Sequence, residues 1–175
     1  MQVVYWTGNG FAANPNDVDR FSHAALREAV RRYHYEVWVR GKKVCLLVPN
    51  SIVRDATGKV LLCRTMYGVA MTACKAAGIQ NPDVFFTTRE TTGATTDCLA
   101  LAEKVVVLDP ESVTVCCTTP ETARYFEAMY RGVTRHVLGR ELKASFVSPA
   151  TVPQADLKSR MLYTALWFVT SIANI

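Results

Sequence analysis

The sequence predicts an α/β protein with a Rossmann-like three-layer sandwich, in which a mostly parallel sheet of about five strands lies between helices. Two observations carry this prediction. Short apolar runs alternate with helical stretches five times along the chain, and this alternation is typical of parallel β-α-β units with right-handed crossovers. The runs Lys43–Val48 and Val113–Thr118 are almost continuously apolar, as expected of strands that helices cover on both faces.

The strands are predicted from short β-branched and apolar runs that end at turn residues. The first run is followed by Gly8-Asn9-Gly10 and the second by Pro49-Asn50-Ser51, and both are turn sequences. Tyr35–Val39 either continues the first helix or adds an extra strand. We expect strands at Gln2–Thr7, Lys43–Val48, Val84–Thr88, Val113–Thr118 and Ala144–Val147.

The helices are predicted from apolar spacing and from residues that cap helix ends. Asp17 is expected to cap the first helix, and Thr119-Pro120-Glu121 is a strong helix start. That later helix is expected to stop at Gly132. The other expected helices are Lys59–Ala77, Thr96–Lys104 and a closing helix at about Gln154–Ile172, with Leu157, Met161, Ala165, Phe168 and Ile172 on one stripe.

Length and composition indicate one α/β domain spanning residues 1–175. Half of the residues are hydrophobic and 20% are charged, which excludes a disordered chain. No apolar run approaches the ~20 residues that a bilayer-spanning helix needs, and Met1–Trp6 lacks the basic segment of a signal peptide. We therefore expect a cytoplasmic protein without a membrane partner.

The six cysteines do not suggest a metal site or a disulfide framework. No pair has the CxxC spacing, and no histidine lies at the distance along the chain that a zinc finger requires. Most of the cysteines lie in apolar runs. We expect buried, reduced thiols and no bound metal.

Basic residues are concentrated in one part of the chain. Between Arg20 and Arg64 there are ten basic and three acidic residues, whereas the whole chain carries a net charge of +5. This excess is compatible with a solvated helix face or with an anionic partner such as phosphate or nucleic acid.

Candidate ligand-binding residues follow the predicted strands, at the edge where open parallel sheets bind ligands. Glycines after the first strand let backbone N–H groups approach an anion, and the Thr-rich segment Thr87–Asp97 and the helix start Thr118–Arg124 add hydroxyls and arginines. Helix capping is the alternative explanation of the threonines, and Glu121 also suits a helix dipole. The candidates are Gly8, Asn9, Gly10, Asn50, Ser51, Thr88, Arg89, Thr95, Thr96, Thr118, Thr119, Glu121 and Arg124, with Glu90 as the candidate acid or base.

In chain order, part of this set resembles the YdcF-like family. The matching positions are the glycine turn after strand one, Arg20 with Ala24 four residues on, Glu90, Thr96, Thr118 and Arg124. The chain departs from the family pattern where Pro49-Asn50-Ser51 replaces Ser-Gly-Gly, where Gly93, Thr95, Cys98 and Leu99 replace polar positions, and where Glu121 replaces a histidine. The resemblance implies a Rossmann-like fold, a ligand-binding role for Arg20 and S-adenosylmethionine as a candidate cofactor.

Three functions remain open at this point. The first is an enzyme, a hydrolase or a transferase, that acts on a nucleotide-like or phosphorylated ligand. In that enzyme Glu90 is the acid, base or ribose partner, and Arg89 and Arg124 hold the anionic part. The second is a non-catalytic sensor or sequestering protein that uses the same cleft. The third is a nucleic-acid-binding protein that uses the Arg20–Arg64 region, although that region has no interleaved aromatic residues of the RNA-recognition type.

Overall fold

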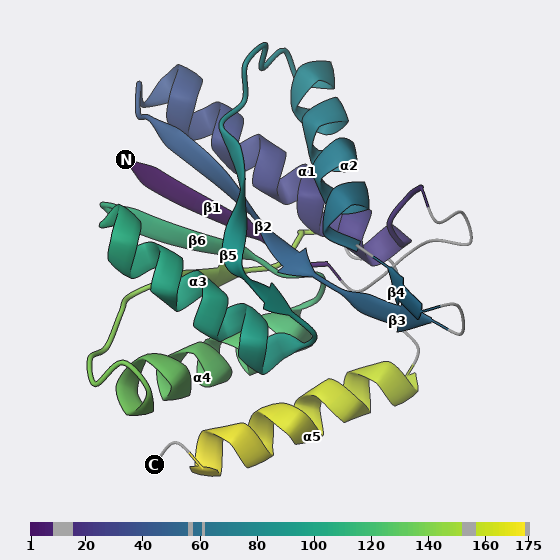
Figure 1. The fold of residues 1–175 in the computed structure, drawn as a ribbon, viewed down its shortest axis with the longest axis vertical. Helices are drawn as coiled ribbons and strands as arrows, with labels where there is room; N and C mark the ends of the chain where they lie inside the picture. The colour runs from purple at the N-terminus through teal and green to yellow at the C-terminus, as the bar shows by residue number, and fades with distance from the viewer. Residues whose placement is uncertain (9–15, 56–57, 61, 152–156, 174–175) are drawn as a thin grey trace.

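Five strands form one all-parallel sheet at the centre of the molecule, in the order β5-β2-β1-β6-β7 (Figure 1). The computed structural model describes residues 1–8, 16–55, 58–60, 62–151 and 157–173. A separate antiparallel pair, β3 (Val53–Asp55) and β4 (Gly58–Val60), extends from the end of β2. The sheet strands are β1 (Gln2–Trp6), β2 (Val44–Ser51), β5 (Val84–Thr91), β6 (Ser112–Cys116) and β7 (Ser145–Val147).

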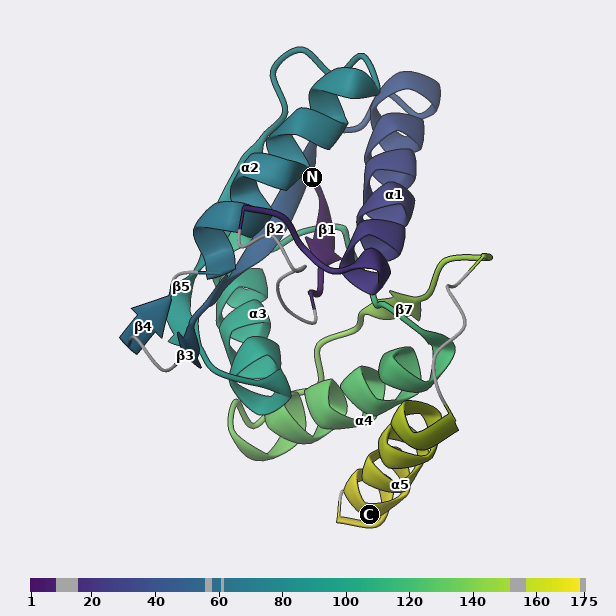
Figure 2. The same ribbon diagram turned by 90° about the vertical axis from the view of Figure 1, so that its right-hand side faces the viewer.

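Helices cover both faces of this sheet. One face packs against α1 (Arg20–His34) and α2 (Leu62–Ala76), and the other packs against α3 (Ala94–Leu108) and α4 (Pro120–His136). The last helix, α5 (Leu157–Ala173), lies against α4 and away from the sheet (Figure 2). The predicted Rossmann-like three-layer sandwich is therefore confirmed.

The alternation of side chains along β1 builds the two cores. Val4 and Trp6 point into the core beneath α1 and α2, whereas Val3 and Tyr5 point into the core beneath α3 and α4. All four side chains are buried, because consecutive residues of a strand face opposite sides of a sheet. The same rule sends Cys116 to the first core and Cys117 to the second.

Several element ends differ from the predictions, and each difference has a local cause. Asp19 caps α1 in place of Asp17, since its carboxylate accepts hydrogen bonds from the backbone N–H groups of Phe21 and Ser22. Gly132 does not end α4; it is buried inside the helix, which continues to His136. Tyr35–Val39 prolongs α1 as a π-helix and is not a strand.

The closing helix forms, but the described side chains of its apolar stripe are not buried. Met161, Phe168 and Ile172 of the predicted stripe are exposed in α5. The contacts of α5 with the rest of the molecule are concentrated on α4. None of the helices in the described parts of the chain has the length and apolar character that crossing a bilayer requires.

All six cysteines are free and buried, so their thiols should react slowly in the native protein. Burial raises the pKa of Cys116 to about 12 and that of Cys45 to about 11, and only the thiolate is the nucleophile. We expect a bulky maleimide to label the native protein at least roughly tenfold more slowly than the urea-unfolded protein. Rapid labelling of Cys116 and Cys117 under native conditions, followed by mass spectrometry, would contradict this burial.

Candidate functional site

The direction in which successive strands are added to the sheet reverses at one point, and this point lies between β1 and β6. From β1 the chain proceeds outward through β2 to β5, and it then returns to β6 on the other side of β1. Open α/β sheets bind ligands beyond the carboxyl ends of the strands at such a point. The segments that follow β1 and β6 therefore define the first place to look for a site.

Buried threonines gather at this edge and bond to each other and to the backbone. The Thr7 hydroxyl donates to the carbonyl oxygen of Cys116 at 3.2 Å, which ties the ends of β1 and β6 together. Thr119 caps α4 by accepting from the backbone N–H of Thr122 at 3.1 Å, and the two hydroxyls lie 2.9 Å apart. Thr118 donates to the Thr122 hydroxyl at 3.3 Å. These contacts make Thr119 the helix cap. They also engage the buried threonine hydroxyls in hydrogen bonds on the interior side of this edge.

Gly8 lies where the chain leaves β1, and it is packed closely between two helices. A Cβ atom at this position would come 2.7 Å from the Cε atom of Met66 in α2 and 3.5 Å from the hydroxyl of Ser22 in α1. Asn9 and Gly10 lie outside the residues that the structure describes. Of the predicted turn Gly8-Asn9-Gly10, the structure therefore describes Gly8. Glycine fits at this position because the passage between α1 and α2 is narrow.

Asp97, in the first turns of α3, is an acidic group that the sequence analysis did not single out. Its Oδ1 atom is buried and has no hydrogen-bond partner among the described residues, and the Thr91 hydroxyl bonds to the carboxyl group. Burial raises the pKa of Asp97 from its ordinary 3.8 to about 6. Burial is also the main cause of the raised pKa of the Tyr5 hydroxyl, to which Asp97 adds. Asp97 is thus a carboxylic acid whose pKa is raised toward neutral pH, and it lies near the ends of β1 and β5.

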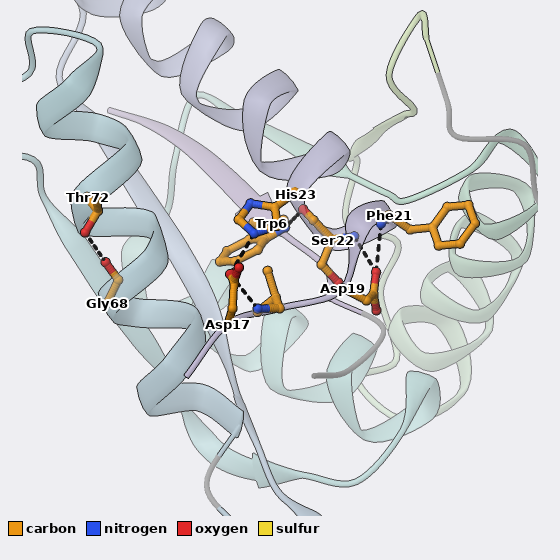
Figure 3. A network of polar contacts seen from close by, with 9 residues as sticks. Trp6, Asp17, Asp19, Phe21, Ser22, His23, Gly68 and Thr72 are labelled. Atoms are coloured by element: carbon orange, nitrogen blue, oxygen red, sulfur yellow. Dashed lines mark hydrogen bonds and ion pairs between the residues drawn. The ribbon is translucent and has the colours of Figure 1, made fainter. Parts of the chain in front are cut away.

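A second polar arrangement lies on the other side of the sheet, in a groove between α1 and α2 (Figure 3). The imidazole of His23 lies with its Nε2 atom 2.7 Å from Oδ1 of Asp17, and the same oxygen accepts from the backbone N–H of Val18 at 2.8 Å. These contacts lower the pKa of Asp17, the backbone hydrogen bond most of all. Since an ionised carboxylate only accepts hydrogen bonds, Nε2 carries the proton of this pair.

The groove has a volume of about 640 Å³ and begins at the carboxyl edge of the sheet. Asn16 and Asp17 come from the segment after β1, and Arg64 and Thr65 come from the first turn of α2. The guanidinium of Arg64 makes no ion pair or hydrogen bond among the residues described. The groove therefore combines a guanidinium, which can take an anion, with an imidazole whose second nitrogen is not engaged within the described chain.

The structure separates the predicted site residues into groups. Asn50 and Ser51 end β2 and face Glu90 and Thr91 on β5 in register. This ribbon projects past the end of β1, and the hydroxyls of Ser51 and Thr91 lie 3.1 Å apart. Thr88, Arg89 and Glu90 are exposed on β5, which is the edge strand. Glu90 remains a predicted acid or base, on the ribbon and not in the buried threonine cluster.

Two predicted ligand-binding side chains are instead engaged in ion pairs with neighbouring helices. Arg89 is held by Glu103 of α3, with a shortest distance of 2.6 Å. Glu121 accepts from Arg160 of α5 at 2.9 Å. The first pair connects β5 to α3 and the second connects α4 to α5, while the Glu121 carboxyl is also hydrogen-bonded to Thr119 of the threonine cluster.

The remaining candidates have local roles or other surroundings. The Thr96 hydroxyl donates to the carbonyl of Gly93 at 2.8 Å and accepts from the N–H groups of Thr92 and Gly93, so it caps α3. Thr95 is exposed and contacts the sulfur of Met129. The guanidinium of Arg20 lies 5.0 Å from the ring centre of Phe21. Arg124, about one turn into α4, lines a groove between α4 and α5.

Sequence reasoning did not predict the pairing of Asp17 with His23, and it assigned no site role to Arg64 or Asp97. The spacing of six residues between Asp17 and His23 spans a loop and a helix start, and no helical or metal-binding pattern marks it. Among the residues described, no cluster of three or more metal-ligating side chains occurs. Comparison with known protein families, curated proteins and solved structures found no match for this chain.

Replacing Asp97 by asparagine should change how stability depends on pH. Because its native pKa is raised, the wild-type protein gains stability below pH 4 and loses it as the pH rises through about 6. The Asp97→Asn variant lacks this loss, so its free energy of unfolding relative to wild type should rise by up to about 3 kcal/mol between about pH 4 and pH 7. Urea unfolding at both pH values measures the difference.

The exposed carboxyl of Glu141 provides the control. Glu141→Gln removes one negative charge from the surface and should leave the pH profile of stability as in wild type. An Asp97→Asn variant whose stability follows the same pH profile as wild type would mean that Asp97 is ionised in the native state without penalty.

Proposed function

We propose that this protein binds a small anionic ligand, nucleotide-like or phosphorylated, at the carboxyl edge of its sheet. The observation that carries the proposal is the groove between α1 and α2, where the hydrogen-bonded pair Asp17–His23 and the guanidinium of Arg64 line one cavity. Its volume of about 640 Å³ lies within the usual range for small-molecule sites, about 300 to 1,000 Å³.

Each group in the groove has a distinct role toward such a ligand. Arg64 supplies a planar, permanently charged fork that matches the oxygens of a phosphate or a carboxylate. Asp17 fixes the orientation and the tautomer of His23, so that the second ring nitrogen is the one able to meet a ligand hydroxyl or to exchange a proton with it. The amide of Asn16 and the hydroxyl of Thr65 add polar contacts in the same groove.

S-adenosylmethionine is the first ligand to test, because the resemblance to the YdcF-like family implies it and because its carboxylate suits Arg64. A ligand that is bound but unchanged supports the sensor or sequestering role, and turnover supports the enzyme. If the ligand is turned over, Glu90 is the proposed catalytic acid or base, because it lies on the ribbon that projects beyond β1.

The test compares two variants of α2 that remove the same charge. Arg64→Ala should weaken binding of S-adenosylmethionine, or of a small molecule that co-purifies with the protein, by roughly tenfold or more, since a hydrogen bond to a charged group contributes about 1.5 to 3 kcal/mol. Lys75→Ala changes an exposed cation in the last turn of the same helix and should leave binding as in wild type. Isothermal titration gives both affinities, and mass spectrometry of the denatured protein identifies a co-purified ligand.

The pair Asp17–His23 supplies the second arm. Asp17→Asn keeps an oxygen for the Val18 N–H but removes the charge opposite His23, and binding should fall while the melting temperature stays close to that of wild type. Affinities that are the same in wild type, Arg64→Ala and Asp17→Asn would place the ligand elsewhere.

A further inference from the structure

A second groove lies on the far side of the molecule, where α4 and α5 run side by side in the same direction (Figure 2). Three contacts along the two helices fix this direction. Glu121 of α4 pairs with Arg160 of α5, the rings of Tyr125 and Tyr163 lie 6.1 Å apart, and Ala128 lines the groove together with Trp167. The volume of this groove is about 330 Å³.

The wall that α4 contributes is strongly basic. Arg124, Arg131 and Arg135 line the groove, and all three are exposed. They are spaced seven and four residues apart, so a helix of 3.6 residues per turn carries them on one side. Glu127 is the acidic residue of the lining, and it is bonded to Arg131 at 2.7 Å. The lining therefore has an excess of two positive charges.

The wall that α5 contributes is aromatic. Trp167 lines the groove opposite the arginines and is only partly buried, and Ser171 lies one turn further along α5. The guanidinium of Arg124 makes no hydrogen bond or ion pair among the described residues. An accessible indole face next to several guanidinium groups is the combination that binds a planar base together with its phosphate.

From this geometry we infer that the groove between α4 and α5 binds a nucleoside phosphate, with the phosphate on the arginines and the base against Trp167. The inference concerns a site separate from the groove between α1 and α2. A free nucleotide and a single-stranded nucleic acid both present this chemistry, and the experiment distinguishes them.

The basic stretch Arg20–Arg64 offers less to an anion than its composition suggests. Arg31 and Arg32 are both bonded to Glu28, at 2.8 and 2.7 Å, and Arg40 is bonded to Glu36 at 3.3 Å. Lys42 is bonded to Glu111 at 2.8 Å. Local acids thus neutralise part of that stretch, whereas the guanidinium of Arg124 in the groove between α4 and α5 has no such acid among the described residues.

The experiment measures binding of two probes to the full chain. One is AMP, followed by isothermal titration. The other is a fluorescein-labelled oligothymidylate of about ten nucleotides, a length within the range that single-strand sites cover, followed by anisotropy at several salt concentrations. We expect Arg124→Ala to weaken binding of the phosphate and to lower the salt slope by roughly 0.7 per lost contact for a single strand. Trp167→Leu should weaken it at least about fivefold, as loss of base stacking does.

Two control variants keep the inference falsifiable. Arg27→Ala removes an exposed arginine of α1, and Lys75→Ala removes an exposed cation of α2, both on the opposite face of the sheet. Both should bind the probes as wild type does. Trp167→Phe, which keeps an aromatic ring, should recover most of the affinity lost in Trp167→Leu.

Each outcome of this experiment either identifies the source of the phosphate or overturns the inference. Binding of AMP alone identifies a free nucleotide as the source of the phosphate, and binding of the oligonucleotide identifies a nucleic-acid strand. No binding of either probe, equal losses in Arg27→Ala and Arg124→Ala, or tighter binding of polyglutamate than of the oligonucleotide would overturn the inference. Loss of AMP binding in Arg64→Ala but not in Arg124→Ala would place the nucleotide in the groove between α1 and α2, and it would overturn this inference without counting against the proposed function.

Discussion

Burial of the central strands on both faces is the constraint on which the rest of the molecule depends. Trp6, Leu46, Leu47 and Val115 have at most 1% of their surface exposed, and complete burial of such a side chain contributes about 1.5 to 3 kcal/mol. An unpaired polar group costs free energy within a sheet covered in this way, and the buried hydroxyl of Tyr5 in β1, which has no hydrogen-bond partner among the described residues, is an exception. Both grooves lie at the ends of the strands or on the outer surfaces of the helices.

The start of α1 shows how the choice of one capping residue leaves a neighbouring acid for another contact. Asp17 and Asp19 are both suitable helix caps, and sequence alone does not rank them because they stand two residues apart. Asp19 takes the backbone N–H groups of the first turn. Asp17 is then free to meet His23, one turn into the helix. With Asp19 as the cap, the carboxylate of Asp17 lies against the imidazole of His23 in the lining of the groove.

The sheet was predictable because its signals are local. Apolar runs, turn residues and cap residues lie within a few positions of one another, and the parallel arrangement follows from their alternation. Boundaries were less predictable where packing overrides a local signal. Gly132 is an example: it is buried within α4, so close packing takes precedence over its tendency to end a helix.

The residues of the candidate site were less predictable, because charged side chains form ion pairs with residues that are distant in the sequence. Arg89 and Glu103 are 14 residues apart, and Glu121 and Arg160 are 39 residues apart. The periodic spacing of apolar and polar residues along the sequence does not indicate such ion pairs. The hydroxyl of Thr96 could serve a ligand or a cap, and the structure assigns the cap. Asp97 was overlooked because a first-turn acid is the ordinary companion of a helix dipole, and its unpartnered, buried oxygen becomes visible only in three dimensions.

The orientation of α4 about its own axis explains why Arg124 lines the groove between α4 and α5. The sheet-facing side of this helix is set by Ala123, Phe126 and Tyr130, which are buried beneath it. Arg124 stands two residues before Phe126, and two residues turn a helix by about 200°. Its side chain therefore leaves the helix on the side of α5, as do those of Arg131 and Arg135. Because the sheet and its buried cores lie between the two grooves, a ligand in one does not touch the residues of the other, and each can be tested alone.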